Sequence, residues 1–213
     1  MDQPRFLVVE GPIGVGKTSL ADRLADRLGA RKIFEAVADN PFLADFYTER
    51  RRYAFQAQLF FLLSRYRQQR ELQQVDLFGQ GVVSDYLFAK DRIFAYLNLD
   101  DNELALYERI HPLLEVRVPK PDLVIYLQAS TDVLLVRLAE RGAAYEKGTS
   151  REYLEDVNQA YSHFFFHYRE TPLLVVNTSE IDFVKRREDL DDLLHAIHQT
   201  TQGTRYYVPR SVS

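Results

Sequence analysis

The stretch "VVEGPIGVGKTSL", residues 8–20, decides the fold of this 213-residue chain. It matches the pattern G-x-x-x-x-G-K-[ST], which begins here at Gly11 and ends at Thr18. The apolar run before it (5–10) predicts a buried strand, and leucines spaced four apart after it (17–28) predict a helix. A glycine-rich turn between a strand and a helix is the context that this phosphate-binding motif requires.

The residue types of this loop suit the phosphates of a nucleotide. Glycines let backbone N–H groups turn toward phosphate oxygens, and the start of the following helix adds a partial positive charge. Lys17 supplies a point charge for the β- and γ-phosphates of ATP, and the hydroxyl of Thr18 can bind Mg²⁺. The expected ATP-binding residues of the loop are Gly11, Pro12, Ile13, Gly14, Val15, Gly16, Lys17 and Thr18.

Apolar strands alternate with helical patterns along the rest of the chain. Further strands are predicted at 32–35, 81–85, 121–128 and 172–177. This alternation predicts one α/β domain over residues 1–213, in which helices cover both faces of a five-stranded parallel sheet. The tail, about 201–213, shows no clear structural pattern.

Composition narrows the class of protein. The chain is 46% hydrophobic and 27% charged, as is usual for a globular protein, and it has no cysteine for disulfides or thiolate chemistry. A net charge of −4 argues against a nucleic-acid partner. No apolar run approaches the roughly 20 residues that span a membrane, and the N-terminus does not resemble a secretory signal. We therefore expect a cytoplasmic protein without a membrane partner.

Two predicted helices, 53–75 and 102–116, carry much apolar surface. They could form a homodimer interface, or they could cover one face of the sheet, and the sequence leaves both readings open.

The residues at the strand ends favour a small kinase. A guanine-reading Asn-Lys-x-Asp motif and the signature of transport ATPases are both absent from the sequence. Glu35 and Asp85 end predicted strands, where open parallel sheets bind ligands, and Asp85 is a candidate Mg²⁺ ligand. Arg137 and Arg141 share one helix face and precede a loop, so they predict a lid at about 137–149 over the ATP phosphates. Each residue alone could be an ordinary surface charge, and it is their order along the chain that favours this site.

Together these segments resemble the deoxynucleoside kinase family, especially its bacterial deoxyguanosine/deoxyadenosine kinase branch. The resemblance covers about residues 5–185 and rests on "EGPIGVGKTSL", "NPFLADFY", "AFQAQLFFLLSRY", "SDYLFAKDRIFA", "PDLVIYLQAS" and "RLAERGAAYEKG". It implies a P-loop kinase that transfers the γ-phosphoryl group of ATP to the 5′-OH of a deoxynucleoside in nucleotide salvage. A purine acceptor is preferred, and deoxycytidine is also compatible.

The resemblance also implies roles for single residues. Glu35 corresponds to the general base that accepts the proton of the 5′-OH, a task that suits a carboxylate. Tyr47 and Glu146 correspond to the pair that holds the sugar 3′-OH. Gln56 corresponds to the glutamine that forms paired hydrogen bonds with the base, because an amide offers a donor beside an acceptor. Asp91 corresponds to an acidic position near the base.

The chain departs from the family pattern at two places. Relatives usually carry arginine and serine after the carboxylate of the third strand, whereas Asp85 is followed here by Tyr86. Arg65 and Arg92 are candidate replacements for that arginine. In the lid, Ala143 stands where relatives often have a further arginine, so the lid would rely on the arginine pair of the preceding helix.

Two other functions remain open. A thymidylate kinase would share the loop and the lid but would need arginines on the acceptor side, for which the run 50–52 is a possible source. A non-catalytic sensor could bind ATP and present a surface to a partner. The combination of Glu35, Tyr47 and the glutamine of "AFQ" favours a neutral nucleoside as the acceptor.

Overall fold

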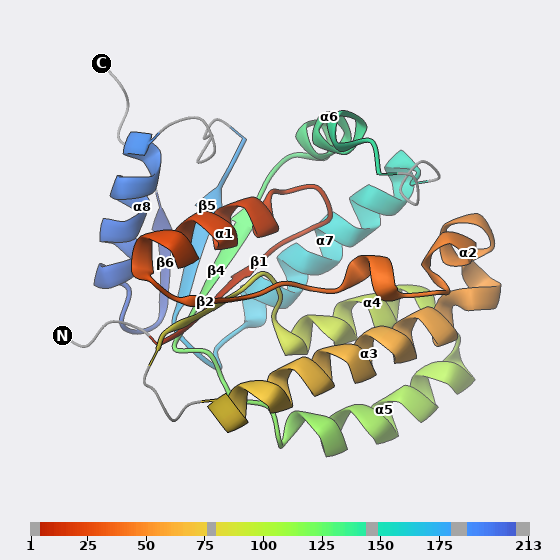
Figure 1. The fold of residues 1–213 in the computed structure, drawn as a ribbon. Coiled ribbons are helices and arrows are strands. Elements are labelled where there is room, and N and C mark those ends of the chain that lie inside the picture. The colour runs from red at the N-terminus through yellow and green to blue at the C-terminus, as the bar shows by residue number, and fades with distance from the viewer. Residues whose placement is uncertain (1–4, 76–79, 144–148, 180–186, 208–213) are drawn as a thin grey trace.

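Six parallel strands form the central sheet of the computed structural model, which describes residues 5–75, 80–143, 149–179 and 187–207 (Figure 1). Their order across the sheet is β2-β3-β1-β4-β5-β6, and every neighbouring pair is parallel. The strands are β1 (Phe6–Glu10), β2 (Arg31–Ile33), β3 (Val82–Ser84), β4 (Leu123–Gln128), β5 (Leu173–Asn177) and β6 (Thr204–Tyr207). The order reverses beside β1, and open α/β sheets bind ligands at such a point.

The helices follow the predicted pattern, and several have clear caps. Asp100 forms a capping box with Glu103, and the hydroxyl of Ser130 accepts from the backbone N–H of Val133. Gly29 ends a helix with φ +61°, a conformation that glycine adopts without strain. The helices are α1 (Lys17–Leu28), α2 (Leu43–Thr48), α3 (Arg50–Val75), α4 (Asp91–Asn98), α5 (Asp101–Glu115), α6 (Thr131–Arg141), α7 (Arg151–His167) and α8 (Arg187–Gln199), with 3-10 turns η1 (Val37–Asp39) and η3 (Phe88–Lys90).

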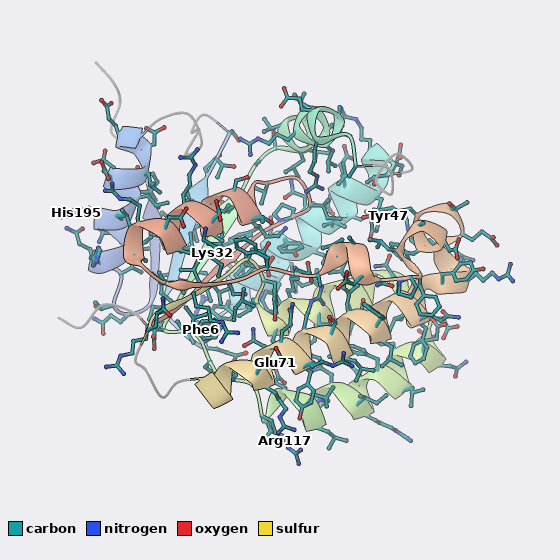
Figure 2. The ribbon with its side chains drawn as sticks, in the orientation of Figure 1. Phe6, Lys32, Tyr47, Glu71, Arg117 and His195 are labelled. Carbon is teal, nitrogen blue, oxygen red and sulfur yellow. The ribbon has the colours of Figure 1, made fainter. Side chains whose placement is uncertain are left out.

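Helices cover both faces of the sheet because successive strand residues point to opposite sides. Leu7 and Val9 of β1 pack into the cluster that includes α1 and α8. Val8 packs into the other cluster, with residues of α2, α3, α4 and α7. Side chains fill the space between the sheet and the helices (Figure 2). α5 lies outside α3, where Leu62 and Tyr107 share a smaller core (Figure 1).

The sheet has one strand more than the sequence predicts. The five predicted strands are present, but β6 pairs with β5 in the segment that shows no clear pattern in the sequence, 201–213. β6 is only four residues long and mostly exposed, so it lacks the apolar run that marks the other strands. Residues 208–213 lie outside the described part of the chain.

Among the helices of the described segments, none combines the length and the apolar character that crossing a membrane would require.

Candidate active site

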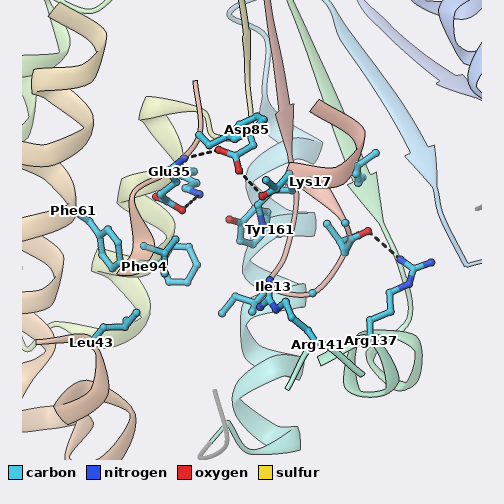
Figure 3. Close-up of a pocket in the computed structure, with 18 of the residues that line it drawn as sticks. Ile13, Lys17, Glu35, Leu43, Phe61, Asp85, Phe94, Arg137, Arg141 and Tyr161 are labelled. Atoms are coloured by element: carbon cyan, nitrogen blue, oxygen red, sulfur yellow. Dashed lines mark hydrogen bonds and ion pairs between the residues drawn. The ribbon is translucent and has the colours of Figure 1, made fainter. Parts of the chain in front are cut away.

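A cavity of about 790 Å³ opens where the loops after the strands meet (Figure 3). The phosphate loop and α6 line one end, Phe61 and Phe94 lie at the other, and Tyr161 lies beside Lys17 (Figure 3). The aromatic residues are Phe34, Phe46, Tyr47, Phe61, Phe94, Tyr153 and Tyr161. The residues predicted from the sequence that also line this cavity are Ile13, Gly14, Val15, Gly16, Lys17, Thr18, Glu35, Tyr47, Arg65, Asp85, Arg137 and Arg141. The cavity therefore has a charged end and an aromatic end, with carboxylates between them.

The phosphate loop is shaped by positive backbone angles and closed by Lys17. Gly14 and Gly16 have φ of +83° and +103°, which glycine allows without strain. The ammonium of Lys17 donates to the carbonyl oxygens of Gly11 (2.7 Å) and Pro12 (3.1 Å). Burial, together with the positive charge of Lys90, lowers the pKa of Lys17 to about 8. Lys17 is therefore mostly ionised at neutral pH and lies within reach of an anion that enters the loop.

The replacement Gly11→Ala should disrupt this loop. A Cβ at Gly11, whose φ is +155°, would lie 2.5 Å from the carbonyl oxygen of Leu127 and 2.9 Å from a methyl group of Val15. We expect a loss of about 1–3 kcal/mol in stability from this overpacking and a loss of ATP affinity. Chemical denaturation and isothermal titration with ATP measure the two effects.

Gly29→Ala is the matched control for this loop variant. Gly29 also has a positive φ, but nothing lies within 4 Å of a Cβ placed there. It should cost roughly 1–2 kcal/mol from strain alone and leave ATP affinity unchanged. Equal ATP affinity of Gly11→Ala and wild type would contradict the expected role of the loop.

Thr18 and Asp85, the two side chains predicted to hold Mg²⁺, are hydrogen-bonded to each other. The hydroxyl of Thr18 donates to Oδ2 of Asp85 at 2.5 Å, and Oδ1 of Asp85 accepts from the backbone N–H of Glu35 at 2.8 Å. In the described part of the chain, no group of three or more His, Cys, Asp or Glu side chains could hold a metal. Two oxygen ligands still fit Mg²⁺, which usually keeps several waters and binds substrate phosphates.

Glu35 lies between the two ends of the cavity and is paired with two cations. Nε of Arg65 donates to its Oε1 at 2.6 Å, and Nζ of Lys90 donates to its Oε2 at 3.1 Å. Burial alone would raise the pKa of Glu35, but the charges and hydrogen bonds of Arg65 and Lys90 outweigh it and lower the pKa to about 2. Glu35 is therefore a carboxylate at any physiological pH.

Behind the aromatic end, Asp91 organises a buried polar cluster. Nε2 of Gln58 donates to the backbone oxygen of Asp91 at 2.8 Å and to its Oδ1 at 2.5 Å, and the hydroxyl of Tyr107 also donates to Oδ1. Arg65 forms an ion pair with the other carboxylate oxygen. Asp91 is wholly buried and is not one of the residues that line the cavity, whereas Gln58 and Arg65 are. Asp91 thus orients the amide of Gln58 and the guanidinium of Arg65.

The structure does not support Gln56 as a residue of the cavity, and the glutamine of α3 that lines the cavity is Gln58. Gln56 is exposed, whereas Gln58 is 6% exposed and lines the cavity. Residues two apart on a helix point in directions about 200° apart, so both cannot face one site. The spacing of residues in the sequence could have identified Gln58. It precedes Arg65 by seven residues, or two helical turns, so both lie on one face of α3.

The arginines of α6 approach the phosphate loop. Nη1 of Arg137 donates to the carbonyl oxygen of Val15 and to the hydroxyl of Thr178, both at 3.0 Å, and Nη2 donates to the carbonyl oxygen of Thr178 at 2.7 Å. Arg141 lines the cavity one turn further along (Figure 3). Glu146 and most of the predicted lid loop, 144–148, lie outside the described residues.

The arginine run 50–52 does not supply an acceptor-side phosphate site. The guanidinium of Arg50 lies 3.7 Å from the ring centroid of Tyr153, and Arg51 and Arg52 are exposed. Within the described segments, none of these three residues lines the cavity.

Comparison with known proteins shows which family has similar sequences. The family model described as "Deoxynucleoside kinase" matches residues 7–202. Deoxyguanosine kinase of Bacillus subtilis is 37% identical over 196 residues, which cover 90% of this chain and 95% of that protein. Deoxyadenosine kinase of Dictyostelium discoideum is 37% identical over 180 residues, covering 82% of this chain and 72% of that protein.

A solved structure supports the fold independently. The structure of deoxyadenosine kinase from M. mycoides with dCMP and dCDP bound has a TM-score of 0.79 and 23% sequence identity, and the match covers 91% of this chain and 98% of that one. The family match runs from β1 through α8, and thus includes the phosphate loop, Glu35 and the Asp91 cluster. The chain therefore belongs to the deoxynucleoside kinase family.

Proposed function

We propose that this protein transfers the γ-phosphoryl group of ATP, with Mg²⁺, to the 5′-OH of a deoxynucleoside in nucleotide salvage. The acceptor is preferably a purine deoxynucleoside, deoxyguanosine or deoxyadenosine, with deoxycytidine also accepted. The observation that carries the proposal is the place of Glu35 between the phosphate loop and the aromatic end of one cavity. The relatives named deoxyguanosine kinase and deoxyadenosine kinase support the choice of acceptor.

The reaction would depend mainly on positioning and charge. The 5′-oxygen forms a bond to the γ-phosphorus while the bond from that phosphorus to the β,γ-bridging oxygen breaks, and the proton of the 5′-OH passes to Glu35. The loop amides, Lys17, Arg137 and Arg141 would bind the ATP phosphates, and Thr18 with Asp85 would hold the metal. Bound Mg²⁺ would neutralise charge on the phosphate oxygens.

At the acceptor end, the base would lie among apolar rings. Phe61 and Phe94 line this end together with Leu43 (Figure 3), and aromatic rings offer stacking surface to a base. Gln58 would bind the base edge, while Tyr47 and Glu146 would bind the sugar 3′-OH.

The test is an assay of ADP formation with each of the four deoxynucleosides and, separately, with dTMP. We expect turnover with purine deoxynucleosides and little with dTMP. Turnover of dTMP and of no deoxynucleoside would establish the thymidylate kinase alternative. ATP binding without turnover of any acceptor would favour the sensor.

The two glutamines of α3 provide a sharp test of the acceptor site. Gln58→Ala should lower kcat/KM for the deoxynucleoside by roughly 5- to 150-fold, because removing a buried hydrogen-bonding group costs about 1–3 kcal/mol. Gln56→Ala, on the exposed side of the same helix, should change kcat/KM by less than about twofold. Steady-state kinetics at saturating ATP measure both, and the reverse order of effects would place the base at Gln56.

We also propose a cytoplasmic homodimer that forms through the long helices. Apolar side chains remain exposed on α3 and α5: Leu63 is 45% exposed, Leu106 48% and Leu113 72%. Exposed apolar surface of this kind often marks a protein interface. Size-exclusion chromatography with light scattering tests this, and a single species of monomer mass at micromolar concentration would contradict it.

A further inference from the structure

Lys90 is a buried lysine to which neither the motifs nor the relatives' names assign a role. It ends η3, its side chain is only 3% exposed, and it lines the cavity. Its Nζ lies 3.1 Å from Oε2 of Glu35 and 3.7 Å from Oε2 of Glu10. An ammonium group is costly to bury unless charges and hydrogen bonds compensate it. Its burial at this point of the cavity therefore calls for an explanation.

Glu10 holds Lys90 in place from the core. Glu10 is wholly buried at the end of β1 and accepts hydrogen bonds from the backbone N–H of Gly11 (2.8 Å), the backbone N–H of Leu87 (2.7 Å) and the hydroxyl of Tyr161 (3.2 Å). These donors come from the phosphate loop, the segment after β3 and α7. Glu10 therefore has a fixed position, and so has the cation beside it.

Lys90 lies close to both reacting sides of the cavity. Its contact with Glu35 places it at the predicted 5′-OH, and its contact with Glu10, which accepts from the backbone N–H of Gly11, places it beside the phosphate loop. The side chain that follows Asp85, Tyr86, supplies no charge there, because it is wholly buried and burial raises its pKa. Lys90 is thus a cation between the acceptor carboxylate and the donor loop.

We propose that Lys90 is a further catalytic residue, which binds the γ-phosphoryl group as it passes from ATP to the 5′-oxygen, and that Glu10 is the positioning residue that holds it there. The proposal rests on the proposed kinase function. In the step itself the O5′–P bond forms, the bond to the ADP leaving oxygen breaks, and the 5′-OH proton goes to Glu35. Lys90 donates hydrogen bonds to the phosphoryl oxygens, whose charge is spread in the transition state.

A purely structural role is the competing explanation, in which Lys90 only neutralises Glu10. The two explanations differ in one variant. If neutralisation were the whole role, removing both charges in Glu10→Gln/Lys90→Met would restore turnover. If Lys90 binds the phosphoryl group, turnover by the double variant remains low. This holds even though the variant loses one negative and one positive buried charge and leaves no unpaired charge at Glu10.

The experiment compares Lys90→Met, Lys90→Arg, Glu10→Gln and the double variant. We expect Lys90→Met to lower kcat by about 100-fold, as for loss of one transition-state donor, while the Kd for ATP without acceptor changes by less than about threefold. Lys90→Arg should recover at least about a tenth of wild-type kcat, because it restores a cation. The acid limb of kcat/KM should also move to higher pH in Lys90→Met, because Glu35 loses one of the cations that lower its pKa.

The contradicting outcomes are distinct. Turnover of Lys90→Met, or of the double variant, within about threefold of wild type would overturn the catalytic role of Lys90. Lys120→Met is the matched control, since Lys120 is 71% exposed and pairs with Glu170 on the surface. Wild-type protein and this control, measured in the same assay, report on the kinase function itself, so its failure is distinguishable from a failure at Lys90.

Discussion

The replacement Glu35→Gln should lower kcat by about 100- to 10,000-fold, the range that a positioned general base contributes. Glutamine has nearly the shape of glutamate and can still accept hydrogen bonds through its amide oxygen, but it cannot take the proton of the 5′-OH. The proposed ATP site is formed by the phosphate loop and α6 and does not depend on the Glu35 carboxylate, so ATP affinity should be retained. Single-turnover kinetics with the preferred deoxynucleoside measure the chemical step.

Two comparisons make this result interpretable. Glu49→Gln changes an exposed glutamate at the end of α2 and should retain full turnover. Because the neutral amide would leave Arg65 and Lys90 less well compensated, the melting temperature and the ATP affinity of the Glu35→Gln variant are measured alongside. A folded Glu35→Gln protein that binds ATP and keeps more than about a tenth of wild-type kcat would show that another group receives the proton.

Replacing Lys17 should have the second large effect. Lys17→Met removes the point charge at the β- and γ-phosphates, and we expect kcat/KM to fall by about 100- to 1,000-fold, as for loss of a preorganised transition-state donor. The ammonium also holds the loop through Gly11 and Pro12, so ATP affinity should fall as well. Isothermal titration and steady-state kinetics separate the two contributions.

The lowered pKa of Lys17 also predicts how ATP affinity depends on pH. Burial and the charge of Lys90 lower its pKa to about 8, so the side chain is charged below that pH and becomes neutral above it. The affinity of the free protein for ATP should therefore be nearly constant from about pH 6.5 to 7.5 and fall above about pH 8, by up to tenfold per unit. Lys17→Arg, which stays ionised, should show no such fall, and the same flat profile in wild type would contradict the low pKa.

The phosphate loop follows from sequence because its residues are contiguous. A strand, a glycine-rich turn and a helix occupy residues 6–28, and the motif that they form is recognisable without reference to any distant residue. Glu35 and Asp85 were predictable for a related reason, since they follow β2 and β3, neighbouring strands whose carboxyl ends meet at one edge of a parallel sheet. The parallel sheet with helices on both faces was predictable from the alternation of apolar strands and helices.

The acceptor half depends on long-range packing and was predicted less well. α3 is buried on two sides, against the sheet in one cluster and against α5 in another, so its apolar residues mark no single face and the register of Gln56 and Gln58 could not be read from them. No pattern in the sequence marks Lys90 as a site residue, because only the fold brings it beside Glu10 and Glu35.

The edge strand β6 covers one side of β5, and this pairing affects how readily the sheet could associate with another molecule. It lies beyond residue 202, where the match to the family model ends, yet its four residues pair with β5. Without it, the outer backbone N–H and C=O groups of β5, a strand of almost wholly buried apolar residues, would lie open to pairing with another molecule. The short, mostly exposed strand, with Arg205 in it, is a poor template for such pairing. We therefore expect these few residues, which lie outside the family match, to protect the sheet from edge-to-edge association.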